Sequence, residues 1–286
     1  MMTLYEEMLA AAEPALVRGL SRFFKTGPGQ YGEGDKFLGI KVPTTRGIVR
    51  RCWRSADFDE LERCITSEYH EVRLAALLAL VEIFSHARRR SSRRFAPQDD
   101  NAEALTFTAE SLSYRAESGT RACGRWHRQA ANLQQQCIDF YLTHTEHINN
   151  WDLVDLSCYP LLGEWLLGRQ DRSLLYDLAR SGRTVWEQRI GIVSTMTFVR
   201  HGQLDDTFAI ADILLHHPHD LIHKAVGWLL REAGKRDKAA LEAFLLGAPN
   251  RAAGLPRYRQ MPRTMLRYAI EKFTESERQA YLKGNV

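Results

Sequence analysis

Helical periodicity runs through nearly the whole chain, and this feature constrains the fold more than any other. Residues 70–87, "HEVRLAALLALVEIFSHA", are apolar on most of a helix circumference, which predicts a buried helix. Residues 184–202 have apolar positions at helical spacing and stop at Gly202, a residue type that favours helix C-termini. Short apolar runs bracketed by turn residues, which would indicate strands, are not evident. The sequence therefore predicts an all-α protein.

The predicted helices come in pairs joined by short turns. Further helical stretches cover residues 204–217, residues 261–273 and a segment that begins at Asp220 and ends near Gly234. The pairs repeat at a loose spacing of ~40 residues, which is the period of HEAT-type repeats. Such repeats stack into an α-solenoid and leave a long concave surface for a ligand. We expect this fold over a single domain, residues 1–286, and an irregular helical bundle is the alternative.

One segment, residues 87–129, departs from the helical pattern. It shows little apolar periodicity, is rich in Ser, Ala and Gly, and starts with five arginines within residues 88–94. We expect a loop or disordered insertion within the domain. Its basic start could contact nucleic acid, or it could simply be solvated.

Composition and charge argue against several classes of protein. No apolar run reaches the ~20 residues of a membrane span, and Glu6 and Glu7 stand where a signal peptide would have basic residues. The five cysteines are dispersed without a CxxC pair, which argues against a disulfide framework or a zinc site. We therefore expect a cytoplasmic protein without membrane contact. The net charge of +4 permits nucleic-acid binding but does not establish it.

The stretch "NNWDLVDLS" places an aromatic residue and a carboxylate on one side of a helix. Asn149 or Asn150 can cap this helix, which leaves Asp152 in the first turn, where the helix dipole favours a carboxylate. At ~100° per residue, Trp151 and Asp155 project within ~40° of each other. This shared face is either functional, or it holds an interfacial tryptophan and an aspartate paired with a neighbouring arginine.

Other residues are candidates for binding. Trp228 follows Gly227, and a small residue there could let a ligand approach the indole closely. Arg189 has apolar neighbours, and a buried arginine generally requires a carboxylate or phosphate partner. Basic residues also recur near helix ends, where they could line one groove with phosphate contacts or remain solvated; they include Arg46, Lys224, Arg231, Lys235 and Arg263. Nucleotide-binding, zinc-protease and serine-hydrolase motifs are absent, and "HHPHD" is a weak candidate for a metal site.

Several blocks of this sequence occur together, in the same order, in one known family. They are "FLGIKVPTTR" (37–46), "HEVRLAALLALV" (70–81), "INNWDLVDLS" (148–157), "RIGIVST" (189–195), "KAVGWLLREAGK" (224–235) and "MPRTMLRYAIEKF" (261–273). With them, nearly the whole chain outside the insertion closely resembles the AlkD-like DNA alkylation repair proteins, which are HEAT-like-repeat DNA glycosylases. The insertion falls where the family would have a short connection.

The resemblance implies an enzyme of base excision repair, a hydrolase acting on N-glycosyl bonds that excises 3- and 7-alkylpurines from duplex DNA. By matched motif, Asp155 would be the catalytic carboxylate, Trp151 and Trp228 would lie against the deoxyribose, and Arg189 would hold the backbone near the lesion. The family grips the lesion from the backbone side, without the base flipping of most glycosylases. The concave basic groove would bind DNA through Lys41, Arg46, Lys224, Arg231, Lys235 and Arg263.

The chemistry fits these residue types. A purine alkylated at position 3 or 7 is cationic, so it leaves as a neutral base and needs no general acid. The remaining oxocarbenium-like sugar is stabilised by a carboxylate, which can also orient the attacking water. Electron-rich indole faces add attraction to the developing positive charge. Neither a metal nor an organic cofactor is required, and we expect a monomer.

Two alternatives belong to other functional classes. One is a catalytically silent HEAT-repeat DNA-binding protein that recognises damaged or branched DNA, and the other is a protein-binding HEAT scaffold. A carboxylate at 155 between two tryptophans favours the enzyme over the first alternative. Basic helix ends favour DNA over a protein partner.

Overall fold

The computed structural model describes residues 2–92, 130–248 and 254–286, and within these ranges the regular structure is helical. The first part of the chain forms α1 (Leu4–Ala10), α2 (Pro14–Phe23), α3 (Val42–Cys52), α4 (Phe58–Ile65) and α5 (His70–Ser92). The middle part forms η1 (Thr145–His147), α7 (Trp151–Cys158), η2 (Tyr159–Gly163), α8 (Glu164–Leu166), α9 (Ser173–Ser181), α10 (Val185–Val193) and α11 (Met196–Arg200). The last part forms α12 (Asp205–Ile213), α13 (Asp220–Arg236), α14 (Lys238–Leu246), α15 (Arg257–Gln260), α16 (Arg263–Ala269) and α17 (Glu275–Lys283). The all-α prediction is confirmed.

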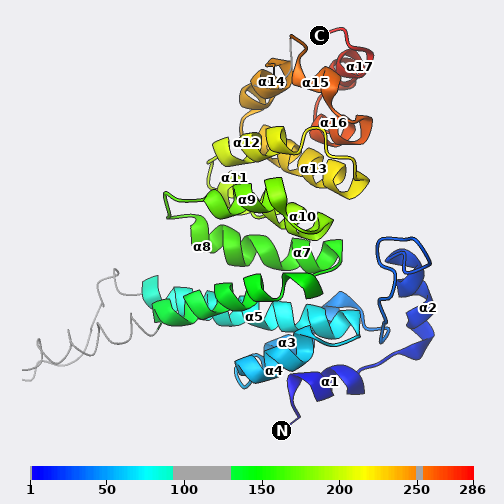
Figure 1. Cartoon of the computed structure of the whole chain (residues 1–286), viewed down its shortest axis with the longest axis vertical. Coiled ribbons are helices and arrows are strands. Elements are labelled where there is room, and N and C mark those ends of the chain that lie inside the picture. Colours follow the sequence, from blue (N-terminus) through cyan, green and yellow to red (C-terminus); the bar gives the residue numbers. More distant parts are fainter. Residues whose placement is uncertain (1, 93–129, 249–253) are drawn as a thin grey trace, which may run out of the picture.

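The helices stack in two rows along the long axis of the molecule. In one row, here called the inner row, α5, α7, α10, α13 and α16 pack each against the next. The partner helices α4, α9, α12 and α14 pack against α5, α10 and α13 from the other side. Figure 1 shows α7, α10, α13 and α16 along one side of the stack and α9, α12 and α14 along the other. This arrangement is the expected solenoid of helix pairs, and among the described residues no helix has the length and apolar character of a membrane span.

Two predicted helices have different ends in the structure. The segment 184–202 is broken into α10 and α11 at Ser194 and Thr195. The Thr195 hydroxyl competes for a backbone group, since its Oγ1 donates to the Ile192 carbonyl at 2.7 Å. The helix from Asp220 continues through Gly234, because this glycine makes room for Leu241 instead of ending the helix. The predicted stop at Gly202, by contrast, is observed, with a φ of 76°.

The first residues of the expected insertion are helical in the structure. Helix α5 extends to Ser92, so the prediction of a loop over residues 87–92 is wrong. Ala87 is still buried in the core. Residues 93–129 lie outside the described part of the chain, and helical structure is described again over residues 130–143. The arginines at 88–90 therefore belong to the end of a long helix.

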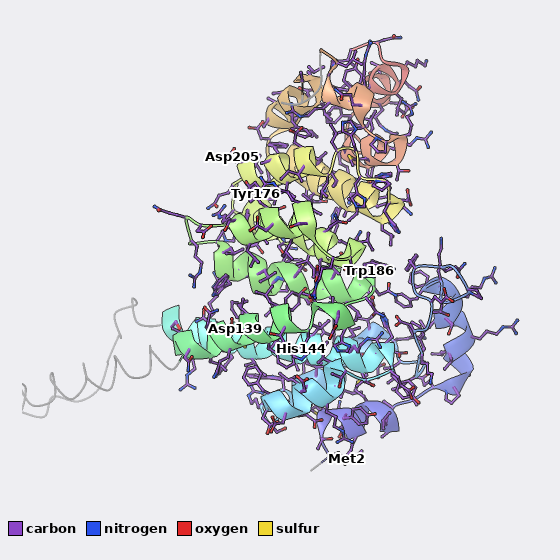
Figure 2. The ribbon with its side chains drawn as sticks, in the orientation of Figure 1. Met2, Asp139, His144, Tyr176, Trp186 and Asp205 are labelled. Carbon is purple, nitrogen blue, oxygen red and sulfur yellow. The ribbon has the colours of Figure 1, made fainter. Side chains whose placement is uncertain are left out.

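A segment beside the stack was not foreseen from the sequence. Residues 14–35, here called the N-terminal arm, comprise α2 and the following loop, and they lie across from the ends of the inner-row helices (Figure 1). The chain after the arm is anchored by the buried carboxylate of Glu71, which accepts hydrogen bonds from the backbone amides of residues 38, 39 and 40 at 2.9–3.0 Å. Trp186 of α10 is labelled in Figure 2. It meets Tyr31 of the arm edge-to-face, with ring centroids 6.0 Å apart.

Close packing of α13 on α16 gives a testable prediction. A Cβ at Gly227 would lie 2.5 Å from the Tyr268 Cβ and 2.6 Å from the Met265 carbonyl, whereas a Cβ at Gly47 in α3 would meet nothing within 4 Å. We expect Gly227→Ala to lower the free energy of unfolding by about 1–3 kcal/mol through overpacking. Gly47→Ala, the matched control, should raise it by roughly 0.5–1 kcal/mol, since alanine favours a helix. Urea denaturation of both variants measures this, and equal stabilities would contradict the packing.

Candidate active site

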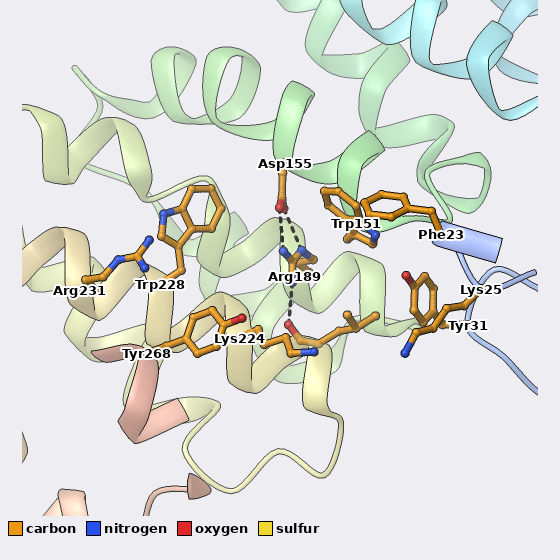
Figure 3. A pocket seen from close by; sticks show the side chains of 11 residues that line it. Phe23, Lys25, Tyr31, Trp151, Asp155, Arg189, Lys224, Trp228, Arg231 and Tyr268 are labelled. Carbon is orange, nitrogen blue, oxygen red and sulfur yellow. Dashed lines mark hydrogen bonds and ion pairs between the residues drawn. The ribbon is translucent and has the colours of Figure 1, made fainter. Parts of the chain in front are cut away.

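A cavity of about 620 Å³ opens between the inner row and the N-terminal arm. Its walls come from segments far apart in the sequence: the arm, α7, α10, α13 and α16. The lining residues are Phe23, Lys25, Tyr31, Trp151, Asp155, Arg189, Leu221, Lys224, Trp228, Arg231 and Tyr268. Figure 3 shows Asp155 between the two tryptophans, with its carboxylate directed at Arg189. The structure thus brings the four principal residues expected from the sequence into one cavity.

Helix α7 presents Trp151 and Asp155 to this cavity one turn apart. Asn150 caps the helix, and its Oδ1 accepts a hydrogen bond from the Trp151 amide at 2.9 Å. Leu153 and Val154 point into the core and are fully buried. The indole and the carboxylate therefore share a face of α7 other than the one that carries Leu153 and Val154.

Asp155 forms a two-point ion pair with Arg189 of α10. Arg189 Nε and Nη2 donate to the two carboxylate oxygens at 2.8 and 2.7 Å, and Nη1 donates to the Leu221 carbonyl at 2.6 Å. The side chains of Arg189 and Asp155 are only 6% and 15% exposed. The pairing of Asp155 with a neighbouring arginine, one of the two interpretations of the sequence, is thus observed.

Burial sets the acidity of Asp155. Burial raises the pKa of the Asp155 carboxyl above the ordinary 3.8. The positive charge and the hydrogen bonds of Arg189 lower this pKa, and the nearby negative charge of Asp152 raises it further. The net direction is upward, because the carboxylate has lost most of its contact with water. Keeping Asp155 ionised therefore costs free energy. Carboxyl groups with pKa values raised by burial are common at functional sites.

Trp228 forms the opposite wall, on α13. The residue before it, Gly227, does not provide space for a ligand at the indole; it allows the α16 backbone at Met265 to approach α13. Trp228 also borders a second cleft of about 480 Å³, together with Arg200, Lys235 and Arg236. Trp228 therefore lines both hollows.

The basic residues expected to bind DNA divide into three groups. Arg189, Lys224 and Arg231 line the cavity, where Lys224 pairs with Asp220 at 2.7 Å and Arg231 pairs with Glu271. Lys235 belongs to the second cleft. The remaining three, Lys41, Arg46 and Arg263, line neither hollow, and Arg263 donates to the Leu282 carbonyl at 2.7 Å.

Sequence reasoning missed the aromatic and basic residues of the arm and α16. Phe23, Lys25 and Tyr31 reach the cavity from one side, and Tyr268 from another. Two signals could have indicated them: Phe23 ends an amphipathic helix as an exposed aromatic, and Tyr31 stands in the glycine-rich stretch "TGPGQYGEG". One histidine of "HHPHD" has a structural role: His219 caps α13 by accepting a hydrogen bond from the Leu221 amide at 3.1 Å.

Comparison with known proteins gives a consistent result. A family model described as "DNA alkylation repair enzyme" matches residues 4–101 and 85–273. A solved structure, "Predicted DNA alkylation repair enzyme from Enterococcus faecalis", superposes with a TM-score of 0.55 and 13% identity, over 92% of this chain and 97% of that one. At that identity the structural likeness shows a shared fold. A comparison with curated protein sequences gives no match.

The ion pair of Asp155 predicts a loss of stability on neutralisation. Asp155→Asn removes the charge that compensates buried Arg189, so we expect the free energy of unfolding to fall by about 1–3 kcal/mol, less than for a fully buried pair because Asp155 is partly exposed. Asp206→Asn is the matched control: Asp206 pairs with Arg172 at 2.5 Å, at 16% and 15% exposure, away from the cavity. Thermal and urea melting should show similar losses, and an Asp155→Asn variant as stable as the parent would contradict the pairing.

Proposed function

The chain belongs to the DNA alkylation repair enzyme family, and from this premise we propose that it is a glycosylase that excises cationic 3- and 7-alkylpurines from duplex DNA. The observation that carries the proposal is the position of Asp155, an anion between two indoles in an open cavity with a cationic rim. A role in alkylation repair follows from the family. The reaction and the residues that perform it are what we propose.

The proposed reaction needs electrostatic stabilisation and one water molecule. The bond between C1′ of the deoxyribose and the purine nitrogen breaks, and its electron pair neutralises the cationic base. The sugar is left as an oxocarbenium-like cation, and water adds at C1′ while losing a proton to the solvent or to Asp155. A fixed anion beside C1′ lowers the energy of that cation and can orient the water. Because the base leaves neutral, no side chain has to donate a proton to it.

Arg189 fits this scheme as the group that fixes the carboxylate. Its Nε and Nη2 hold both oxygens of Asp155, and its Nη1 is fixed by the Leu221 carbonyl. Each carboxylate oxygen keeps a second lone pair that can face the sugar or a water molecule. Arginine carries five N–H donors, so it can hold Asp155 and also donate to a phosphate beside the lesion.

The cavity walls suit a nucleotide approached from its backbone. Trp151 and Trp228 flank Asp155 with π-systems that attract a developing cation (Figure 3). Lys25, Lys224 and Arg231 stand around the cavity, where phosphates can be neutralised with release of counterions. We infer that the deoxyribose enters between the indoles while the base stays in the duplex.

A second candidate function is a catalytically silent protein that binds damaged or branched DNA. The observation that favours it is the two-point pairing of Asp155 with Arg189, which neutralises the carboxylate that catalysis requires. A protein-binding scaffold is the third candidate. The cationic residues around the cavity favour DNA over a protein as the partner.

Single-turnover excision of 7-methylguanine from a defined duplex tests the proposal. We expect Asp155→Asn to lower the excision rate by about 10²–10³-fold, because one preorganised charge is lost from the transition state. Asp206→Asn, expected to lose comparable stability, should excise at the parental rate. DNA affinity is measured in parallel by fluorescence anisotropy.

The outcomes separate the three candidates. Binding of duplex DNA without release of 7-methylguanine by the parent protein would identify a silent binder. If the parent protein neither binds duplex DNA nor releases 7-methylguanine, a protein-binding scaffold is indicated. Full activity of the Asp155→Asn variant would remove Asp155 from the mechanism.

The acidity of Asp155 predicts the pH dependence of excision. Only the ionised carboxylate stabilises the sugar cation, and its pKa is raised by burial, so activity should fall with decreasing pH before the ordinary 3.8 is reached. The acid limb is measured as the enzymatic rate after subtraction of spontaneous depurination. A rate that stays constant down to 3.8 would show that the protonation of Asp155 does not matter.

A further inference from the structure

A buried cluster of charged groups lies behind the candidate active site and lines none of its surface. At its centre is His70, the first residue of α5, which is 1% exposed. Its Nδ1 lies 3.1 Å from Asp35 Oδ2 and its Nε2 lies 2.9 Å from Asp152 Oδ2. The two carboxylates are 3% and 5% exposed. The ring therefore joins three segments: the N-terminal arm, α5 and the first turn of α7.

The ring is held as a cation. Burial by itself lowers the pKa of His70, but the hydrogen bonds and charges of Asp152 and Asp35 outweigh it and raise the pKa to about 9. Only a protonated imidazole donates from both nitrogens, which is what two carboxylate partners require. Arg73 adds a second positive charge, with Nη2 2.6 Å from Asp35 Oδ1, so two cations balance two anions.

The cluster is coupled to the site through Trp151. Asp152 is the next residue along α7. Phe24 of the arm contacts both rings: it lies tilted against His70, with centroids 4.7 Å apart, and stacks on Trp151, with centroids 5.6 Å apart. Phe37 also stacks on the imidazole, with ring centroids 4.8 Å apart. The arm that His70 anchors also carries Lys25 and Tyr31 into the cavity wall. A displacement of His70 would therefore displace Phe24, on which the Trp151 indole stacks.

We propose that His70, clamped between Asp35 and Asp152, is a positioning residue that fixes Trp151 and the N-terminal arm against the catalytic helix. The inference rests on the proposed glycosylase function and deepens it. Removing one member of a buried charge cluster leaves the others uncompensated, so the arm and the start of α7 separate or shift. A displacement of about 1 Å at a catalytic centre can cost about 10²-fold in rate.

A double-mutant cycle with Trp151 tests the proposal by single-turnover excision. We expect His70→Gln to lower the rate by at least about tenfold in the parent, while DNA affinity changes by less. In a Trp151→Ala background the same change should have an effect of less than about twofold, because the group that His70 positions is gone. Equal effects in the two backgrounds would overturn the inference.

Glu71→Gln is the matched control for general damage near this end of α5. Glu71 is the next residue, is equally buried, and anchors residues 38–40, but it has no bond to Asp35 or α7. Its effect should be the same with and without Trp151. If His70→Gln fails to fold, Asp35→Asn replaces it, since this change keeps the shape of the side chain and removes one charge from the clamp.

A spectroscopic measurement keeps the inference separate from the proposed function. The emission of Trp151 is obtained as the difference between each protein and its Trp151→Phe counterpart. We expect this difference spectrum to change in His70→Gln and Asp35→Asn and to stay constant in Glu71→Gln. An unchanged spectrum would overturn the positioning role even if the parent protein excises 7-methylguanine. A changed spectrum would support the positioning role even if the parent protein has no glycosylase activity.

Discussion

Apolar packing between successive inner-row helices is the interaction on which the rest of the structure depends. Sheets are absent from the described residues, so α5, α7, α10, α13 and α16 gain their stability by burying one face against the next helix. Small residues let the backbones approach: a Cβ at Gly227 or at Gly163 would lie 2.5 Å from a neighbouring atom. This close stacking brings residues of α7, α10 and α13 onto one cavity wall, although long stretches of sequence separate them.

The stack leaves polar groups at its inner surface, and their pairing is specific. Arg189 would be costly in this position without a partner, and Asp155 together with the Leu221 carbonyl supplies one. The same bonds fix the orientation of the carboxylate that we propose for catalysis. Stability and proposed function therefore depend on one ion pair. Asp206→Asn separates the loss of stability from the loss of activity, because Asp206 also belongs to an ion pair but lies away from the cavity.

The first turn and a half of α7 carries two aspartates with different partners. Asp152 points inward to His70 and the arm, and Asp155 points to Arg189 and the cavity. Trp151 lies beside both, stacked on Phe24 of the arm. The negative charge of Asp152 also helps to raise the pKa of Asp155, so the buried cluster and the site are coupled by charge as well as by packing. Tyr31 of the arm completes the cavity wall. The helical periodicity of the sequence could not predict this position, because Tyr31 lies in a loop.

The sequence by itself determined which segments are helical and which side chains share a helix face. Residues 70–87 are apolar around most of the circumference, and Trp151 and Asp155 follow from the 3.6-residue period, because both are local properties of the chain. Only the tertiary structure decided that Asp155 meets Arg189, 34 residues away, that α16 and not a ligand occupies the space at Gly227, and that the arm lies beside the inner row. Partner choice across a stack depends on the summed packing of all its helices, which no local pattern encodes.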